Sequence, residues 1–175
     1  MMEVLILHKG MGKKEAFECM GAILTYDKLD KLSTNFGAYL QSRGLEKGDK
    51  IALMMPNLLQ YPVALFGALK AGLTIVNTNP LYTPREMEHQ FTDSNVKAIV
   101  IAENFAINLQ QVIGNTEISI VLTASIGGML GAIKGRLTNF VVRKIKRMVP
   151  TYNIPNTVTV KDAIKQGSKF TLTDV

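Results

Sequence analysis

Three short apolar runs, separated by two segments of helical periodicity, restrict the folds available to this chain more than any other feature. The runs lie at Ile51–Met55, Leu73–Val76 and Ala98–Ala102. Each is apolar at successive positions instead of every second one, which is typical of strands covered on both faces. Strand, helix, strand, helix and strand in this spacing predict an α/β fold, with a mostly parallel sheet and helices on both faces.

The two intervening segments carry recognisable helix boundaries. Thr83-Pro84-Arg85-Glu86 places a hydroxyl at the N-cap, proline at the first helical position and a carboxylate at the third, which together form a capping box. Asn95 is the expected end of this helix. The preceding helix is predicted from about Leu59 to Ala71, and Gly72 terminates it.

The flanking sequence extends the same architecture. Two short strands are expected within Glu15–Leu24, and Thr25 is expected to cap a helix that ends at Gly44. Downstream, a further helix and a further strand are predicted at Ala106–Ile113 and Ile118–Leu122.

Length and composition indicate a single folded unit in the cytoplasm. A chain of 175 residues can bury one core, and we expect a flexible lead-in at residues 1–14 and one α/β subdomain at 15–175. The single cysteine, Cys19, rules out an internal disulfide and suits a reducing compartment. The apolar run among the first ten residues is too short for a signal peptide or a transmembrane helix.

Positive charge is concentrated in one part of the chain. No Asp or Glu occurs between Glu117 and Asp162, whereas seven of the 20 Lys and Arg residues lie there, so the net charge of +6 is local. A helix is predicted at 130–148 with a line of apolar residues, Ile133, Leu137, Phe140, Val141, Ile145 and Met148. Its cationic side chains are candidates for contact with a membrane: Arg136, Arg143, Lys144, Lys146 and Arg147.

Three interpretations of this basic helix remain open. The helix could pack on its own domain with a solvated basic face, it could contact an anionic membrane surface, or its cations could bind a phosphate-bearing ligand. Nucleic acid is not expected as a partner, because no interleaved aromatic residues or recognition module accompany the charge.

Other motifs give little support for a ligand site. Asn79 and Tyr82 follow a predicted strand, where α/β sheets place ligands, but loop closure and packing also explain them. The glycine-rich segment 123–135 lacks the Gly-Lys-Ser/Thr ending of a phosphate-binding Walker loop, and no G-x-G-x-x-G follows a strand. Neither histidine has metal-ligand spacing. We therefore assign no catalytic, cofactor-binding or metal-binding residue.

Several segments resemble one known family. LTYDKLDKLS, DKIALMMPNLLQYPVALFGALKAG, NTNPLYTPREMEHQFTDSNVKAIVIAENFA and NFVVRKIKRMVP are similar to the N-terminal region of bacterial long-chain fatty acid–CoA ligases. These enzymes belong to the adenylate-forming superfamily of acyl-CoA synthetases. The resemblance extends from about residue 16 to 167 and implies the N-terminal subdomain of the acyl-CoA synthetase fold.

The resemblance also implies an activity and its cofactors. The family activates a fatty acid with ATP and Mg²⁺ to an acyl-adenylate and then transfers the acyl group to coenzyme A. The family's phosphate loop, adenosine-binding motifs and C-terminal lysine domain find no counterpart in the 175 residues, so this chain alone is expected to be inactive and to need the remainder of the ligase as a partner. The alternative is a non-catalytic α/β module that docks on a membrane or a partner through helix 130–148, on the inner face of the membrane.

The resemblance to one subdomain of a larger domain generates a prediction about assembly. A face that packs against the remainder of such a domain is apolar, and large exposed apolar patches drive association. We therefore expect the 175-residue chain to form oligomers, or an intimate homodimer, in solution. Light scattering over a wide concentration range measures this, and a strictly monomeric profile at all concentrations would contradict it.

Overall fold

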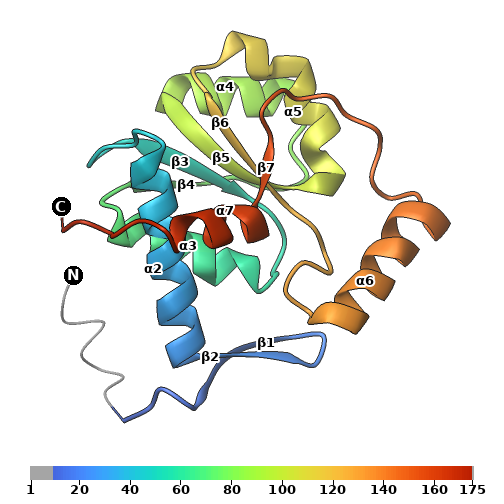
Figure 1. The fold of residues 1–175 in the computed structure, drawn as a ribbon. Coiled ribbons are helices and arrows are strands. Elements are labelled where there is room, and N and C mark those ends of the chain that lie inside the picture. Colours follow the sequence, from blue (N-terminus) through green and yellow to red (C-terminus); the bar gives the residue numbers. More distant parts are fainter. Residues whose placement is uncertain (1–9, 175) are drawn as a thin grey trace.

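The computed structural model describes residues 10–174 and contains the predicted parallel sheet (Figure 1). All neighbouring strands of this sheet run parallel, in the order β4-β3-β5-β6-β7. In chain order they are β3 (Lys50–Met54), β4 (Thr74–Asn77), β5 (Val96–Ala102), β6 (Ile120–Ala124) and β7 (Val158–Thr159). The α/β class and the parallel sheet predicted from the sequence are confirmed.

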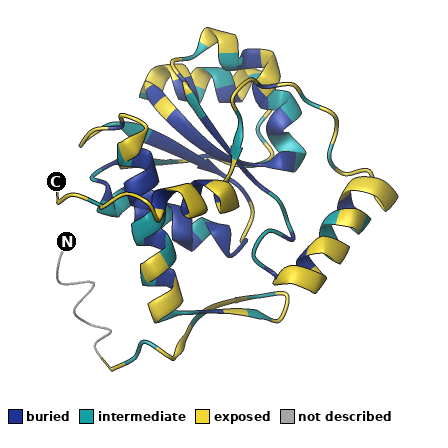
Figure 2. Ribbon diagram, viewed as in Figure 1, coloured by how far each residue is buried: buried dark blue, intermediate teal, exposed yellow. Residues whose placement is uncertain are grey.

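Helices cover both faces of the sheet, and alternate strand residues enter two separate cores. Leu53, Val100 and Leu122 belong to one core, while Met54 and Ile99 belong to the other. The first core is completed by α2 (Tyr26–Ser42), α3 (Gln60–Lys70) and α7 (Val160–Gly167), and the second by α4 (Pro84–Ser94) and α5 (Ala106–Val112). The three central strands, β3, β5 and β6, are accordingly buried from both sides, whereas the edge strands β4 and β7 are partly exposed (Figure 2).

Two elements lie outside these layers (Figure 1). The antiparallel hairpin of β1 (Glu15–Cys19) and β2 (Ala22–Thr25) precedes α2. On another side of the molecule, α6 (Ala132–Phe140) continues into a single π-helical segment, η3 (Val141–Ile145). The short 3₁₀ segments η1 (Glu103–Phe105) and η2 (Ile113–Asn115) flank α5.

The predicted flexible lead-in falls only partly within the described residues. Residues 1–9 lie outside them. Residues 10–14 form a turn, in which the N–H of Lys14 donates to the carbonyl of Met11. The turn is held to the start of α2, because the N–H of Asp27 donates to the carbonyl of Gly12. The division of the chain at residue 14 therefore stays a prediction.

The caps of α4 and α2 are confirmed. The Thr83 hydroxyl accepts from the N–H of Glu86 at 3.4 Å, and the Glu86 carboxylate accepts from the N–H of Thr83 at 2.8 Å. The backbone hydrogen bond from Thr83 lowers the pKa of Glu86. At the other end, Asn95 adopts the left-handed conformation with φ of 50°. The Thr25 hydroxyl caps α2 by accepting from the N–H of Lys28.

The structure departs from the predicted elements in the last third of the chain. The strand predicted at 118–122 lies two residues later, at Ile120–Ala124, because Ile120 pairs with Ala98 in the sheet. The helix predicted at 130–148 is shorter, since it starts at Ala132 and its regular α-helical part ends at Phe140. Strand β7 and helix α7 were not predicted at all.

Glycine allows α2 to approach both of its neighbouring helices. A Cβ on Gly67 of α3 would lie 2.7 Å from the Ser33 carbonyl oxygen of α2, and a Cβ on Gly37 would lie 2.7 Å from the Gly67 carbonyl oxygen. On the other side, a Cβ on Gly167 of α7 would lie 1.9 Å from the Asn35 carbonyl oxygen. These contacts involve backbone atoms, so they cannot be relieved by a change of rotamer.

Gly67→Ala tests this contact. Alanine improves helix propensity by about 1 kcal/mol, but overpacking against a helix backbone costs about 1–3 kcal/mol, so we expect a net loss of stability. Chemical denaturation followed by circular dichroism measures the change. Gly114→Ala is the matched control, because a Cβ there meets nothing within 4 Å. Equal or higher stability of Gly67→Ala would show that the helices separate without penalty.

Candidate functional site

The basic segment predicted from the sequence is attached to the protein by its small and polar side. Gly135 of α6 lies against Gly127, where a Cβ on either residue would come within 2.3 Å of the other's carbonyl oxygen. Asn139 accepts from the N–H of Gly127 at 2.8 Å and donates to the Ser125 hydroxyl at 3.2 Å. Val142 is buried one turn further on. Backbone contacts, the Asn139 amide and the buried Val142 side chain are therefore among the contacts that fasten this segment.

The apolar line of this helix faces solvent. Ile133 is 86% exposed and Leu137 is 64% exposed, and the same side continues with exposed Phe140, Ile145 and Met148. We call these five side chains the apolar ridge. The helix packs on its own domain through Gly135, Asn139 and Val142 and not through this apolar line.

The five predicted membrane-facing cations lie in three different settings. Arg143 pairs with the buried carboxylate of Glu103, with 3.1 Å between Arg143 Nε and Glu103 Oε1 and a second bond from Nη2 to Oε2. The hydrogen bonding to Glu103 raises the pKa of the Arg143 guanidinium. Arg136 lines a cavity. Lys144, Lys146 and Arg147 are exposed, and they make no side-chain hydrogen bond or ion pair with residues 10–174.

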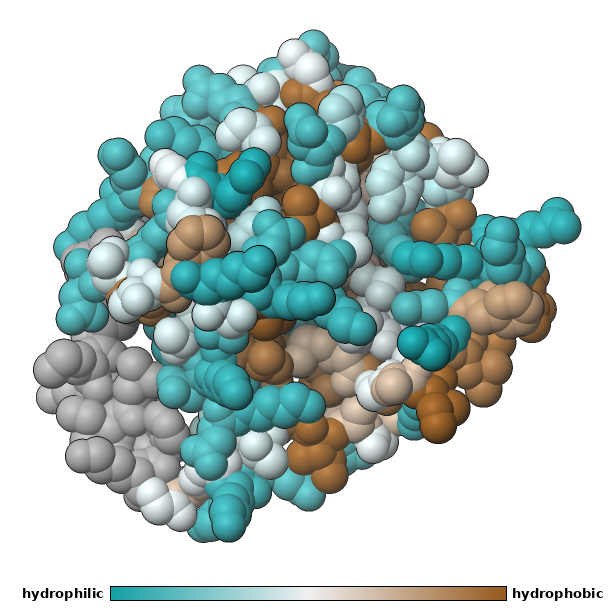
Figure 3. All heavy atoms as spheres, in the orientation of Figure 1, coloured by the Kyte–Doolittle hydropathy of each residue, from teal (hydrophilic) through white to brown (hydrophobic). Residues whose placement is uncertain are grey.

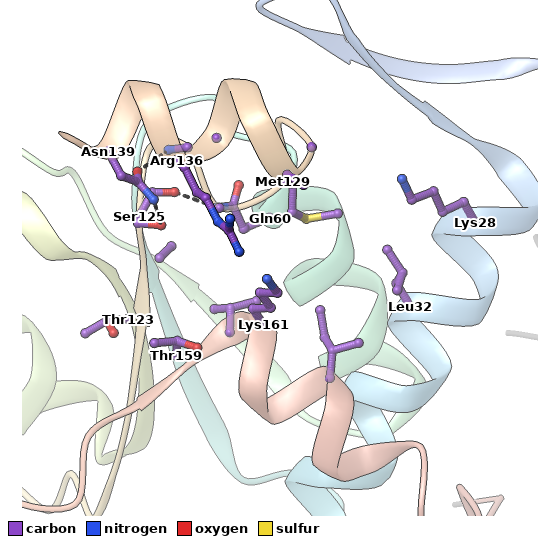
Figure 4. A pocket seen from close by; sticks show the side chains of 18 residues that line it. Lys28, Leu32, Gln60, Thr123, Ser125, Met129, Arg136, Asn139, Thr159 and Lys161 are labelled. Atoms are coloured by element: carbon purple, nitrogen blue, oxygen red, sulfur yellow. Dashed lines mark hydrogen bonds between the residues drawn. The ribbon is translucent and has the colours of Figure 1, made fainter. Parts of the chain in front are cut away.

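A cavity of about 490 Å³ lies between α6, α7 and α2, at the carboxyl ends of β6 and β7 (Figure 4). The buried Gln60 amide lines it and donates to the Ser125 carbonyl at 2.7 Å. Arg136 and Lys161 point toward one another across the opening in Figure 4, and Lys28 approaches from α2. No Asp or Glu is among the residues that line this cavity. It therefore favours an anionic group over a cation.

Asn79 and Tyr82 are not brought to this cavity. They follow β4, at the opposite edge of the sheet from β7. Asn79 closes its own turn, since its side-chain oxygen accepts from the N–H of Leu81 at 3.0 Å and its carbonyl accepts from the N–H of Tyr82 at 3.1 Å. Tyr82 packs half-buried on the second core. Loop closure and packing account for both residues.

Sequence reasoning did not single out Lys28, Gln60 or Lys161, which are among the residues that line the cavity. A local signal existed for Lys161, because the Thr159 hydroxyl accepts from the N–H of Asp162 at 3.1 Å and so caps α7. Thr-x-x-Asp before an apolar-periodic segment is a readable helix start. Nothing local marks Gln60, which meets Ser125 only through the fold.

Within residues 10–174, no group of three or more His, Cys, Asp and Glu side chains could hold a metal ion. No helix in the same range combines the length and apolar character needed to cross a bilayer.

The fold and the match to a sequence family define the class of this protein. Residues 8–140 match the family of AMP-binding enzymes, and the chain belongs to that family. It is similar to the N-terminal region of bacterial long-chain-fatty-acid–CoA ligases.

Two relatives show how strong this similarity is and how much of each protein it covers. The chain is 53% identical over 156 residues to a long-chain-fatty-acid–CoA ligase of Escherichia coli O157:H7, an alignment that covers 89% of this chain and 28% of the relative. The ligase of Haemophilus influenzae is 49% identical over 155 residues, an alignment that covers 88% of this chain and 28% of that ligase. The chain thus spans about 28% of the length of these relatives.

Solved structures share the fold at low sequence identity. An anthranilate CoA ligase in complex with anthranoyl-AMP matches with a TM-score of 0.74 and 15% identity, over 98% of this chain and 28% of that one. A long-chain-fatty-acid-CoA ligase from Archaeoglobus fulgidus matches with a TM-score of 0.71 and 16% identity. The match covers 98% of this chain and 31% of that ligase. These structures contain the present fold as one part of a larger molecule.

The Arg143–Glu103 pair generates a prediction about the attachment of η3. Arg143→Gln leaves a carboxylate that is only 4% exposed without its charged partner, and we expect a loss of about 1–3 kcal/mol of unfolding free energy. Lys144→Gln, the adjacent exposed cation without a partner, is the control and should change stability by less than about 0.5 kcal/mol. Glu103→Gln added to Arg143→Gln should restore part of the loss. Additive effects of the two substitutions would contradict the pairing.

Proposed function

We propose that this chain forms the N-terminal part of a ligase that joins long-chain fatty acids to coenzyme A. The single observation that carries this proposal is 53% identity to a long-chain-fatty-acid–CoA ligase over 89% of the chain. The shared fold of CoA ligases of different acyl specificity supports the general reaction, whereas the long-chain substrate rests on sequence identity alone.

The proposed reaction has two steps. The fatty acid carboxylate attacks the α-phosphate of Mg²⁺-bound ATP, forming an acyl-adenylate and releasing pyrophosphate. The thiol of coenzyme A then attacks the acyl carbon and displaces AMP. Both steps depend on positioned donors around developing negative charge. In this proposal the present chain supplies the scaffold, and the remainder of the ligase supplies the groups that touch ATP.

A second candidate function is a non-catalytic module that docks on a membrane or on a partner protein. The exposed apolar ridge of α6 and η3 favours it, because large apolar side chains are expensive to leave in water unless they bind something. Both candidates place the chain in the cytoplasm, since the ligase reaction consumes ATP and coenzyme A, and the docking surface would meet the inner face of the membrane.

A pyrophosphate-release assay tests the expected inactivity of the 175-residue chain. With oleate, ATP, Mg²⁺ and coenzyme A, we expect no fatty-acid-dependent release above a blank without protein. Release that requires the fatty acid would show that the chain contains an unrecognised reaction centre.

A chimera separates the two candidate functions. This chain replaces the corresponding 28% of the Escherichia coli relative, and the remaining part of that relative serves as the control. We expect the chimera to form oleoyl-CoA and the control to be inactive. A chimera that is folded by circular dichroism but inactive would contradict the ligase proposal and favour the docking module.

A further inference from the structure

The cavity between α6, α7 and α2 carries charge of only one sign. Lys28, Arg136 and Lys161 reach it from three different helices, and no Asp or Glu is among the 18 residues that line it. The side chains of these three cations form no hydrogen bond or ion pair with residues 10–174. Like charges that converge without a counter-charge repel one another, so an anion bound between them removes an unfavourable interaction.

The acids next to these cations in the sequence do not line the cavity. Asp162 follows Lys161, but its carboxylate accepts from the Thr159 hydroxyl at 2.7 Å as part of the cap of α7. Asp27 precedes the lysine of α2 and lies against the N-terminal turn, where a Cβ on Gly12 would come within 2.0 Å of its carboxylate. Neither carboxylate is therefore placed to neutralise the cavity from within.

Uncharged hydrogen-bond donors line the same cavity. The Ser125 hydroxyl accepts from the Asn139 amide at 3.2 Å, and no residue in 10–174 accepts from it in turn, so its proton is available to a ligand. No side chain caps the start of α6, where Gly131 and Ala132 line the cavity, so N–H groups of that turn lie beside it. Donors of this kind favour a ligand that is rich in acceptor oxygens.

The cavity also has an apolar wall. Leu32, Met129 and Ile164 line it and are part of the first core or pack against it. Figure 3 shows hydrophilic and hydrophobic atoms side by side on the face between α7 and α6. The volume of about 490 Å³ lies within the range of small-molecule sites, about 300–1,000 Å³. A ligand that fills this space combines an anionic head with a small apolar body.

We propose that this cavity binds a phosphomonoester with a small organic body. A phosphomonoester matches several cations, because it carries close to two negative charges and its terminal oxygens accept from guanidinium, ammonium and hydroxyl groups together. Arg136 and Lys161 contact the phosphate across the opening, and the Ser125 hydroxyl donates to it. The organic body lies against Leu32 and Met129. All of these residues belong to this chain, so the inference stands independently of the proposed ligase reaction.

Phenyl phosphate is the probe for this site, and benzoate is its matched control. Both place an anion on the same ring, but benzoate carries a single negative charge. Isothermal titration calorimetry with the 175-residue chain should show saturable one-to-one binding of phenyl phosphate and binding of benzoate that is weaker by about 10-fold or more. Inorganic phosphate, which has no apolar body, should also bind more weakly than phenyl phosphate. Equal affinity for phenyl phosphate and benzoate, or no saturable binding, would overturn the proposal.

Removing the two facing cations tests where the phosphate binds. Arg136→Gln combined with Lys161→Gln should weaken the binding of phenyl phosphate about 100-fold, because each charge-assisted hydrogen bond contributes about one tenfold step or more. Lys144→Gln combined with Lys146→Gln is the matched control, since it removes the same charge outside the cavity, and should weaken binding by less than about threefold. All four side chains are exposed, so both double variants should keep the denaturation profile of the unmodified chain. Equal losses in the two variants would show that the anion responds only to net charge.

A hexaglutamate peptide separates a small phosphate ligand from an acidic partner protein. We expect the peptide to bind more weakly than phenyl phosphate, because its carboxylates are singly charged and its chain must be ordered on binding. Binding of the peptide without binding of phenyl phosphate would assign the cavity to an acidic protein segment and refute the proposal. None of these titrations contains ATP, coenzyme A or fatty acid, so their outcome leaves the ligase proposal to be decided by the chimera.

Discussion

Burial of the parallel sheet from both sides is the constraint on which the rest of this structure depends. A strand such as β5 is apolar at successive residues, so covering one face alone would leave half of its side chains in water. Two helical layers are therefore required, and they divide the apolar residues into two cores. The close glycine contacts of α2 with α3 and α7 follow from this, because three helices must fit over one face of a narrow sheet.

Helix α6 is the exception to this arrangement. It covers no part of the sheet, and its apolar side chains join neither core. Its attachment through Gly127, Gly135 and Asn139 gives it a fixed orientation without burying its apolar ridge. A helix held in this way is a surface element, and the packing of the two cores does not explain its apolar residues.

Local signals made much of the fold predictable. The ends of α4 are marked by local residues, the capping box at Thr83 and the left-handed Asn95. The apolar runs mark the central strands. Strand β6 begins two residues later than the apolar run predicted, because pairing of Ile120 with Ala98 of β5 sets its bounds. Strand β7 has two residues, too few to show any period.

The candidate site was less predictable because it depends on contacts between distant segments. Periodicity identifies the apolar line of α6 but does not say on which side of the helix the protein lies. That side is decided by Gly135 meeting Gly127, and a glycine in a loop gives no indication of what approaches it. The pairing of Arg143 with Glu103, 40 residues apart, was equally invisible in the sequence. As a result five cations that look equivalent in the sequence occupy three different environments.

The attachment of α6 by backbone and by one amide separates two properties that most helices must combine. In an ordinary amphipathic helix, the apolar side chains both hold the helix in place and limit which substitutions it tolerates. Here Gly135 and Asn139 hold the helix, while Ile133, Leu137 and Phe140 take no part in the fold. The outer row can therefore be substituted, in nature or by design, at little cost in folding free energy.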